Sequence, residues 1–138
     1  MFNLDVAQNL VNVLKANREK FDMLNWFADE DGYALSMDRA ITHSSYCFST
    51  ACAAGWIVAL YPEKSKELYP LYASKLWPIQ YIAANILGID EYESYKLFLW
   101  DLPSIKLLSR EDEIIEILEK AIDLKVTKLS EVLYDYGL

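Results

Sequence analysis

Apolar side chains recur at helical spacing along most of the chain. Val6, Leu10, Val13 and Leu14 stand at positions i, i+4, i+7 and i+8, and this stripe predicts a first helix over residues 4–20. Similar spacing predicts further helices over residues 49–61, 63–73, 78–87, 90–98, 110–124 and 129–133, with a single helical turn around 37–41.

Prolines and one glycine punctuate this pattern. Pro62 ends one expected helix, and Pro70 is expected to disturb the next. Pro78 stands where the first position of a helix is expected, since a proline there loses no helical hydrogen bond. Gly88 follows at the other end and predicts a left-handed C-terminal stop.

Two polar pairs mark further helix starts. Asp90 with Glu93 three residues on resembles a capping box, and Ser109 with Asp112 repeats the spacing. Together these signals predict an all-α fold, a compact bundle of seven or eight short helices that takes residues 1–138 as a single domain.

Composition narrows the class of protein. The chain has 138 residues and is 54% apolar, so it can bury enough surface to fold and is not expected to be disordered. Its two cysteines are too few for a disulfide framework. The formal net charge of −8 is spread along the chain without a Lys/Arg cluster, which argues against direct nucleic-acid binding. Such acidity serves solubility or presents a negative surface to a basic partner.

The expected cellular location follows from two targeting features that the sequence does not show, a signal peptide and a membrane-spanning segment. Its first residues carry no basic region of a signal peptide, and the longest apolar run, residues 51–61, is too short to span a bilayer. We therefore expect a cytoplasmic protein with no membrane contact and with reduced thiols.

The most distinctive segment holds both cysteines and the single histidine. It contains His43, Cys47 and Cys52, with Ser49 between the cysteines. If Ser49 caps the helix that follows, Cys52 falls at the third helical position, where free N–H groups and the helix dipole stabilise a thiolate.

Several chemistries are compatible with this segment. Cys52 or Cys47 with His43 as base has the residue types of a nucleophilic site, yet no third orienting residue is evident. A structural zinc site needs four ligands, and Cys47, Cys52 and His43 supply only three. The C-x4-C spacing of the cysteines also differs from the C-x-x-C spacing of a redox pair. We favour a structural interpretation, in which both cysteines are small buried residues in an Ala- and Gly-rich tract that lets a neighbouring helix approach.

Residues 77–98 superficially resemble a helix-turn-helix. A DNA-reading helix would begin with basic and amide side chains, whereas this one begins with Asp90, Glu91 and Glu93. We interpret the segment as two packed helices.

Aromatic residues are abundant, with ten Tyr, five Phe and four Trp, which is more than one core of this size can enclose. Tyr and Trp left on a surface often anchor protein partners. The candidates are Tyr33, Tyr61, Tyr69, Tyr72, Tyr92, Tyr95, Tyr134 and Tyr136.

The order of motifs resembles a group of small proteins encoded by phages, prophages and bacteria. The resemblance rests on Phe21-Asp22-Met23-Leu24-Asn25-Trp26, on the segment 47–56, and on Ile86-Leu87-Gly88-Ile89 followed by Leu97-Phe98. Members typically carry F-x-M-x-x-W, C-G-T-x-x-C-x-x-G-W and L-G-L…L-F elements, and an amphipathic helix usually follows. Here C-G-T becomes Cys47-Phe48-Ser49, which keeps the hydroxyl and loses the glycine. The resemblance implies a phage-linked accessory protein and brings no catalytic residue with it.

These observations favour a non-enzymatic protein that binds a host or phage protein, in the host cytoplasm if phage-encoded, with no cofactor. Inhibition of a host defence or nucleic-acid enzyme is one form of this function. Two alternatives stay open: a small-molecule, metal or redox protein centred on Cys47, Cys52 and His43, and a structural homo-oligomer.

Overall fold

The computed structural model describes residues 1–23, 52–99 and 109–136. Its elements are α1 (Leu4–Ala16), the 3-10 turn η1 (Arg18–Lys20), α3 (Ala53–Leu60), α4 (Pro62–Tyr72), α5 (Pro78–Leu87), α6 (Glu91–Ser94), the π-helical turn η2 (Tyr95–Leu99), α7 (Arg110–Leu124), α8 (Ser130–Leu133) and the 3-10 turn η3 (Tyr134–Tyr136). The predicted class, a compact all-α domain, is confirmed. The helical turn expected around 37–41 lies outside the described residues.

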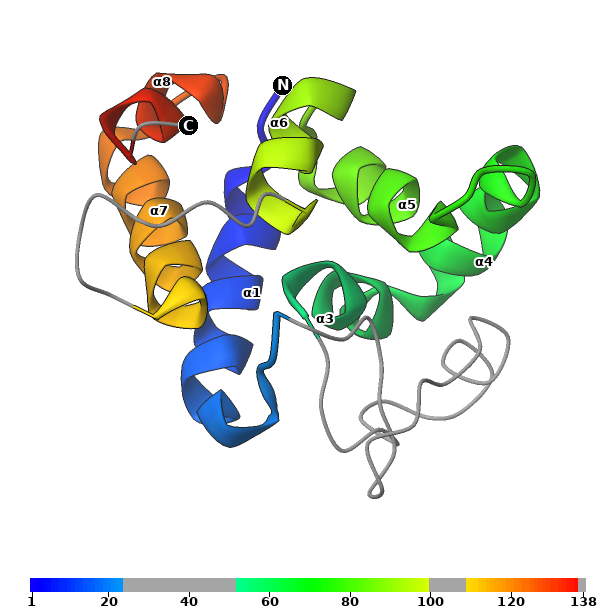
Figure 1. The fold of residues 1–138 in the computed structure, drawn as a ribbon, viewed down its shortest axis with the longest axis horizontal. Helices are drawn as coiled ribbons and strands as arrows, with labels where there is room; N and C mark the ends of the chain where they lie inside the picture. Colours follow the sequence, from blue (N-terminus) through cyan, green and yellow to red (C-terminus); the bar gives the residue numbers. More distant parts are fainter. Residues whose placement is uncertain (24–51, 100–108, 137–138) are drawn as a thin grey trace.

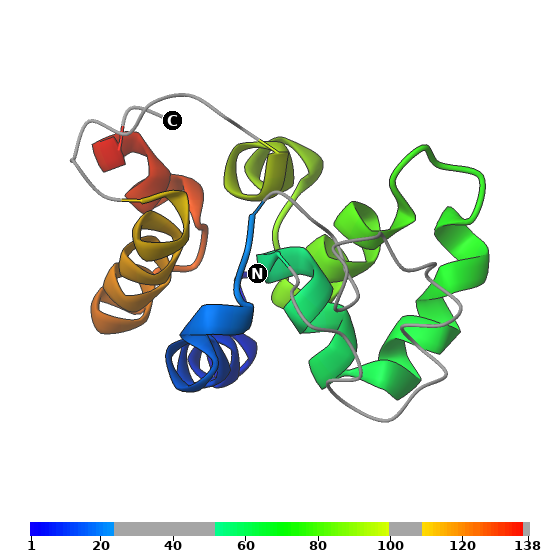
Figure 2. The ribbon, with the colours of Figure 1, turned by 60° about the horizontal axis from the view of Figure 1, so that its bottom comes forward.

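Helix α1 occupies the middle of the arrangement. It packs against α7 on one side and against α3 and α5 on the other, and α4 lies beyond them against α5 (Figure 1). The view in Figure 2 shows the same order, with α1 between α7 and α3. None of the helices in the described ranges is long and apolar enough to cross a membrane.

The core is built from the apolar stripes of these helices. In α1 the predicted stripe is buried at Val6, Leu10 and Leu14, while Val13 is partly buried against the same core. Burial of each such side chain contributes about 1.5–3 kcal/mol before the cost of ordering the chain. The largest fully buried side chains are Leu10, Leu14, Trp56, Ile57, Ile82, Leu87, Leu97, Ile114, Ile117, Leu118 and Leu129.

Helix α1 ends earlier than residue 20, which corrects the predicted boundary. Asn17 leaves the helical conformation with φ −124° and ψ 41°, and its side-chain amide donates to the carbonyl of Val13 at 3.0 Å. The same carbonyl also accepts from Asn17 N at 3.0 Å, so the backbone and the side chain of Asn17 both close the end of the helix. The chain then continues as the 3-10 turn Arg18–Lys20.

The prolines act largely as predicted. Pro62 and Pro78 are the first residues of α4 and α5. Pro70 does not interrupt α4, which continues to Tyr72. It lies in the exposed last turn, where the missing N–H affects only the end of the helix.

Gly88 is confirmed as a left-handed C-terminal residue, with φ +78°. A Cβ atom at this position would overlap the carbonyl oxygen of Met1, because the N-terminal segment crosses directly over it. That segment is held by two backbone bonds, from Asn3 N to Leu87 O at 2.8 Å and from Phe2 N to Thr127 O at 2.9 Å.

Both predicted helix starts are confirmed. Asp90 and Glu93 form a reciprocal capping box at α6. Glu93 is buried, and its second carboxylate oxygen accepts from Ser130 N at 2.6 Å, which ties α6 to the start of α8. Ser109 caps α7 by accepting from Asp112 N at 3.1 Å, and the Asp112 carboxylate accepts from Arg18 Nε at 3.0 Å.

Candidate functional site

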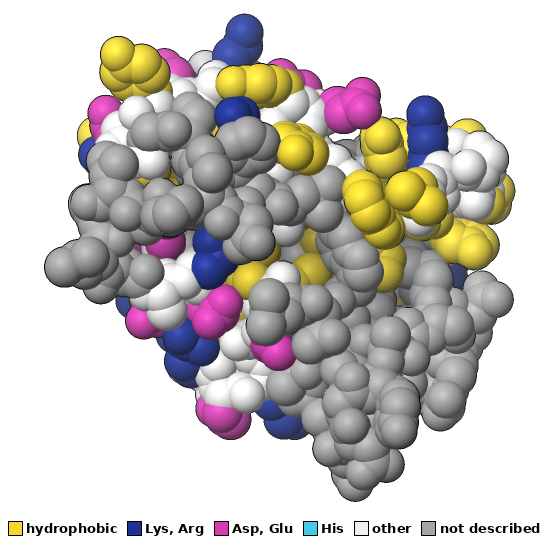
Figure 3. Space-filling model, in the orientation of Figure 1, with side chains coloured by type: hydrophobic (Ala, Val, Ile, Leu, Met, Phe, Trp, Pro, Cys, Tyr) yellow, Lys and Arg dark blue, Asp and Glu magenta, His cyan; other side chains and the backbone are white. Residues whose placement is uncertain are grey.

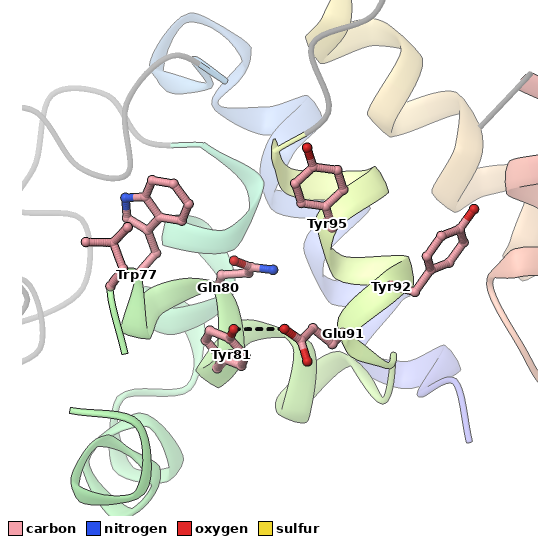
Figure 4. A pocket seen from close by; sticks show the side chains of 7 residues that line it. Trp77, Gln80, Tyr81, Glu91, Tyr92 and Tyr95 are labelled. Carbon is pink, nitrogen blue, oxygen red and sulfur yellow. Dashed lines mark hydrogen bonds between the residues drawn. The ribbon is translucent and has the colours of Figure 1, made fainter. Parts of the chain in front are cut away.

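An aromatic groove of about 590 Å³ lies between α5 and α6. We call it the α5–α6 groove, and it is lined by Leu76, Trp77, Gln80, Tyr81, Glu91, Tyr92 and Tyr95. Figure 4 shows Trp77 and Tyr95 on opposite sides, with the Gln80 amide between them and the pair Tyr81–Glu91 below.

The groove gathers a large share of the exposed apolar surface. Among the described residues, eight large apolar side chains are exposed, and four of them line this groove: Leu76 at 81%, Trp77 at 45%, Tyr92 at 63% and Tyr95 at 44%. Figure 3 shows hydrophobic side chains collected over the region of α5 and α6, while acidic and basic side chains are interspersed on the same face. On this face, apolar area rather than charge is the concentrated feature.

The local sequence explains why these rings point outward. The core side of α5 is formed by Ile79, Ile82 and Ala83, which are buried. Trp77 and Tyr81 are spaced i, i+4 and lie away from that stripe. Trp77 precedes Pro78 as the N-cap residue of α5, and its partly exposed indole lines the groove.

A buried amide forms the polar floor. Gln80 is only 4% exposed, and its Nε2 donates to Ser94 Oγ at 3.0 Å. Ser94 Oγ in turn donates to the carbonyl of Glu91 at 2.8 Å, which leaves it free to accept from Gln80 and so fixes the orientation of that amide. Gln80 Oε1 is therefore the acceptor turned toward the space between Trp77 and Tyr95 (Figure 4).

A carboxylate stands at the edge of the groove. The Tyr81 hydroxyl donates to Glu91 Oε1 at 3.0 Å, and this bond raises the pKa of Tyr81 above its ordinary value. Tyr81 also stacks on Tyr72 of α4, with ring centroids 5.6 Å apart. Glu91 is exposed, so its charge faces solvent and any ligand of the groove.

Two lysines lie over rings at the rim. Lys75 Nζ is 5.2 Å from the centroid of Tyr81, and Lys96 Nζ is 5.2 Å from the centroid of Tyr92. Both distances fall within the range of cation–π attraction. The rings of Tyr81 and Tyr92 therefore already contact the ammonium groups of these two lysines.

The structure brings some of the predicted tyrosines together and not others. Tyr92 and Tyr95 line the groove, and Tyr69 and Tyr72 lie half-buried on the neighbouring α4. Tyr61 is separate, and its hydroxyl accepts from Asn9 Nδ2 at 2.9 Å. Tyr33 lies outside the described residues.

The two C-terminal candidates differ. Tyr134 is 82% exposed but does not line the groove. The prediction of a surface position for Tyr136 is wrong, because it is 2% exposed and its hydroxyl donates to Glu116 Oε1 at 2.8 Å. Burial together with this bond raises the pKa of Tyr136.

Sequence reasoning missed five groove residues, namely Leu76, Trp77, Gln80, Tyr81 and Glu91. A signal was present. Aromatic residues at 77 and 81, and again at 92 and 95, recur at helical spacing outside the apolar stripes that predict the core.

The cysteine segment is only partly described, since His43 and Cys47 lie outside the described residues. Cys52 is the N-cap residue of α3 and not its third residue, which corrects the position expected from a cap at Ser49. Its Sγ accepts from Gly55 N at 3.5 Å, and Met23 Sδ accepts from Ala53 N at 3.5 Å. Two sulfur atoms thus take the first N–H groups of this buried helix start.

Cys52 is a small buried residue, as the favoured structural interpretation expects, and the thiolate that a cap at Ser49 would have stabilised is not favoured. The side chain is 2% exposed, and burial raises the pKa of the thiol to about 12, although the N–H groups of Gly55 and Ala54 act in the opposite direction. Desolvation therefore outweighs the helix N-terminus. Within the described ranges, no three His, Cys, Asp or Glu side chains are grouped so that they could hold a metal ion.

No protein-family model matches the chain, and neither the curated proteins nor the solved structures give a match. The similarity of the cysteine segment to small phage proteins stays a prediction.

Proposed function

We propose that the protein is a non-enzymatic binding module whose partner protein docks in the α5–α6 groove. The observation that carries this proposal is the gathering of Leu76, Trp77, Tyr92 and Tyr95 around a single groove on a surface where charge is interspersed. Aromatic side chains that are partly exposed beside a pocket have the composition of interface hot spots.

The size and rigidity of the groove support this proposal. A volume of about 590 Å³ is suited to one or two inserted side chains rather than to a whole domain. Its walls are fixed from behind, since Tyr81 stacks on Tyr72 and Gln80 is bonded to Ser94. A partner would therefore lose little free energy in ordering the groove.

The biological setting belongs to the same proposal. A phage-linked accessory protein that inhibits a host defence or nucleic-acid enzyme would use such a surface to cover part of that enzyme. Because acidic side chains are interspersed with basic ones on the face in Figure 3, apolar docking is favoured over mimicry of DNA charge as the mode of binding.

The test begins with a photo-reactive benzoylphenylalanine placed at position 92 and, as a control, at position 134. Tyr92 lies in the groove, whereas Tyr134 is also an exposed tyrosine but lies elsewhere. A protein that cross-links from position 92 alone is then purified and its affinity measured directly.

Two double variants decide the outcome. We expect Trp77→Ala with Tyr92→Ala to weaken that affinity at least about tenfold, and Leu124→Ala with Tyr134→Ala to leave it unchanged. Equal losses from both pairs, or none from the groove pair, would contradict the proposal.

Light scattering across a concentration series addresses the homo-oligomer alternative. We expect a constant monomer mass. A doubled mass that the Trp77→Ala, Tyr92→Ala protein no longer shows would identify a second copy as the occupant and would overturn the proposal of a different partner.

A further inference from the structure

Three of the polar groups that line the α5–α6 groove present hydrogen-bond acceptors. Gln80 has its Nε2 committed to Ser94, so that Oε1 is the atom presented. Tyr81 has its hydroxyl proton committed to Glu91 at 3.0 Å, so that only oxygen lone pairs remain. The carboxylate of Glu91 is an acceptor by its nature.

The acceptors differ in exposure. Glu91 is exposed at the edge, whereas Gln80 is 4% exposed and lines the floor of the groove. A ligand that contacts Gln80 therefore has to enter the groove.

Aromatic surface lies between these acceptors. Trp77 forms one wall, and the nearby rings of Tyr81 and Tyr92 already hold the ammonium groups of Lys75 and Lys96 at 5.2 Å. A flat, positively charged end with several donors and an apolar stem would complement the three acceptors and the ring of Trp77, whereas Lys75 and Lys96 add positive charge at the rim. The guanidinium of arginine is planar, carries five N–H donors and stacks on aromatic rings.

We infer that the groove recognises an arginine side chain presented by the partner protein. The guanidinium stacks on Trp77, donates to Gln80 Oε1 at the floor and pairs with Glu91 at the edge, while its methylene stem lies along the apolar rim. Lysine fits less well because a single ammonium neither stacks nor reaches both acceptors at once.

This inference rests on the proposed function, because the arginine belongs to the partner that docks in the groove. Its test needs no partner. The ¹⁵N-labelled full chain is titrated with Nα-acetyl-L-arginine N-methylamide, and the signals of the Trp77 indole N–H and the Gln80 side-chain amide are followed by NMR. The Trp77 signal is assigned from its loss in Trp77→Phe.

Two analogues serve as matched ligands. In the citrulline analogue a neutral ureido group replaces the guanidinium with nearly the same shape, and the lysine analogue keeps the charge without the plane. We expect both signals to shift with the arginine compound, and the citrulline compound to bind at least about tenfold more weakly. Equal binding by citrulline, or shifts confined to other parts of the protein, would overturn the inference.

One pair of variants tests the role of charge. Glu91→Gln removes the carboxylate in the first turn of α6, and Glu63→Gln removes one in the first turn of α4, outside the groove. We expect the first to weaken arginine binding about fivefold and the second to leave it unchanged. The same affinity in both variants would contradict the assignment of Glu91.

The two proposals fail in different ways. If the arginine compound does not bind but the groove double variant still loses its partner, the arginine inference is wrong and the docking site stands. If the compound binds but the double variant keeps its partner, the proposed function is wrong.

Discussion

Glu93 provides the sharpest test of how the fold is held together. Its carboxylate accepts from Asp90 N at 3.1 Å within the capping box and from Ser130 N at 2.6 Å across to α8. The side chain is 5% exposed, so these bonds form largely out of water. A bond from a backbone N–H to a charged group contributes about 1.5–3 kcal/mol.

Replacing Glu93 by Gln keeps the shape and removes one of these acceptors. The amide oxygen retains one bond, while the NH2 group faces a second N–H donor. We therefore expect Glu93→Gln to lower the free energy of unfolding by about 2–3 kcal/mol. Against a total stability of about 5–15 kcal/mol, this loss is large for a change of one atom.

Urea unfolding followed by far-UV circular dichroism measures this difference, with an unchanged m value as the sign that the unfolded state is the same. Glu131→Gln is the matched control, because its carboxylate also accepts one backbone N–H, from Lys128 at 3.3 Å, but is exposed. We expect the control to cost less than about 0.5 kcal/mol. A Glu93→Gln protein as stable as the control would refute the role of this carboxylate in joining α6 to α8.

Three further predictions concern the backbone, the thiol and one surface carboxylate. Gly88→Ala should lower the free energy of unfolding by more than about 2 kcal/mol, because Gly88 has a φ of +78° and an added Cβ would overlap the carbonyl of Met1. Lys125→Gly, at φ 50°, should raise the free energy of unfolding by about 0.5–1 kcal/mol. Thermal unfolding compares the two variants, and a Gly88→Ala protein as stable as wild type would contradict the close approach of the N-terminal segment. In a Cys47→Ser background, the thiol of Cys52, with its pKa of about 12, should react with Ellman's reagent at pH 8 only as fast as the protein unfolds; rapid labelling of the native protein would show that the site opens. The pKa of Asp112 is lowered, chiefly by its hydrogen bond from Arg18, so the folded state favours the charged carboxylate. Asp112→Asn should therefore be less stable than wild type near neutral pH, and the difference in stability should disappear as the pH falls through that lowered pKa. A difference in urea midpoints that does not change with pH would contradict this role of the Asp112 charge.

Local signals in the sequence were sufficient where a local interaction decides the structure. The capping box at Asp90 and Glu93, the start at Pro78 and the stop at Gly88 each depend on residues within one turn, and each was predicted correctly. The second role of Glu93, its bond to Ser130, joins segments far apart in the chain and has no local signal.

The start of α3 shows the opposite case. A hydroxyl at Ser49 is the favoured cap by residue type, but the helix begins at Ala53, with Cys52 as the cap residue. Met23 Sδ, from a distant segment, takes the N–H of Ala53. Packing of the buried helix start therefore decided both the boundary and the protonation state of the thiol.

The groove could be predicted only in part. Tyr92 and Tyr95 were candidates because aromatic residues were in excess, yet nothing local indicated that α5 would bring Trp77 and Gln80 opposite to them. The packing of α5 against α6 determines that juxtaposition.

The central place of α1 has a consequence for synthesis on the ribosome. This helix precedes the helices that cover it, and its contacts with α7 form only after residues 110–124 have been made. Its apolar stripe, with Leu10 and Leu14 fully buried in the finished fold, is therefore exposed to solvent and to chaperones during elongation. Folding that closes around α1 is expected to be late and cooperative, so that a ribosome stalled before α7 would hold an unfinished core.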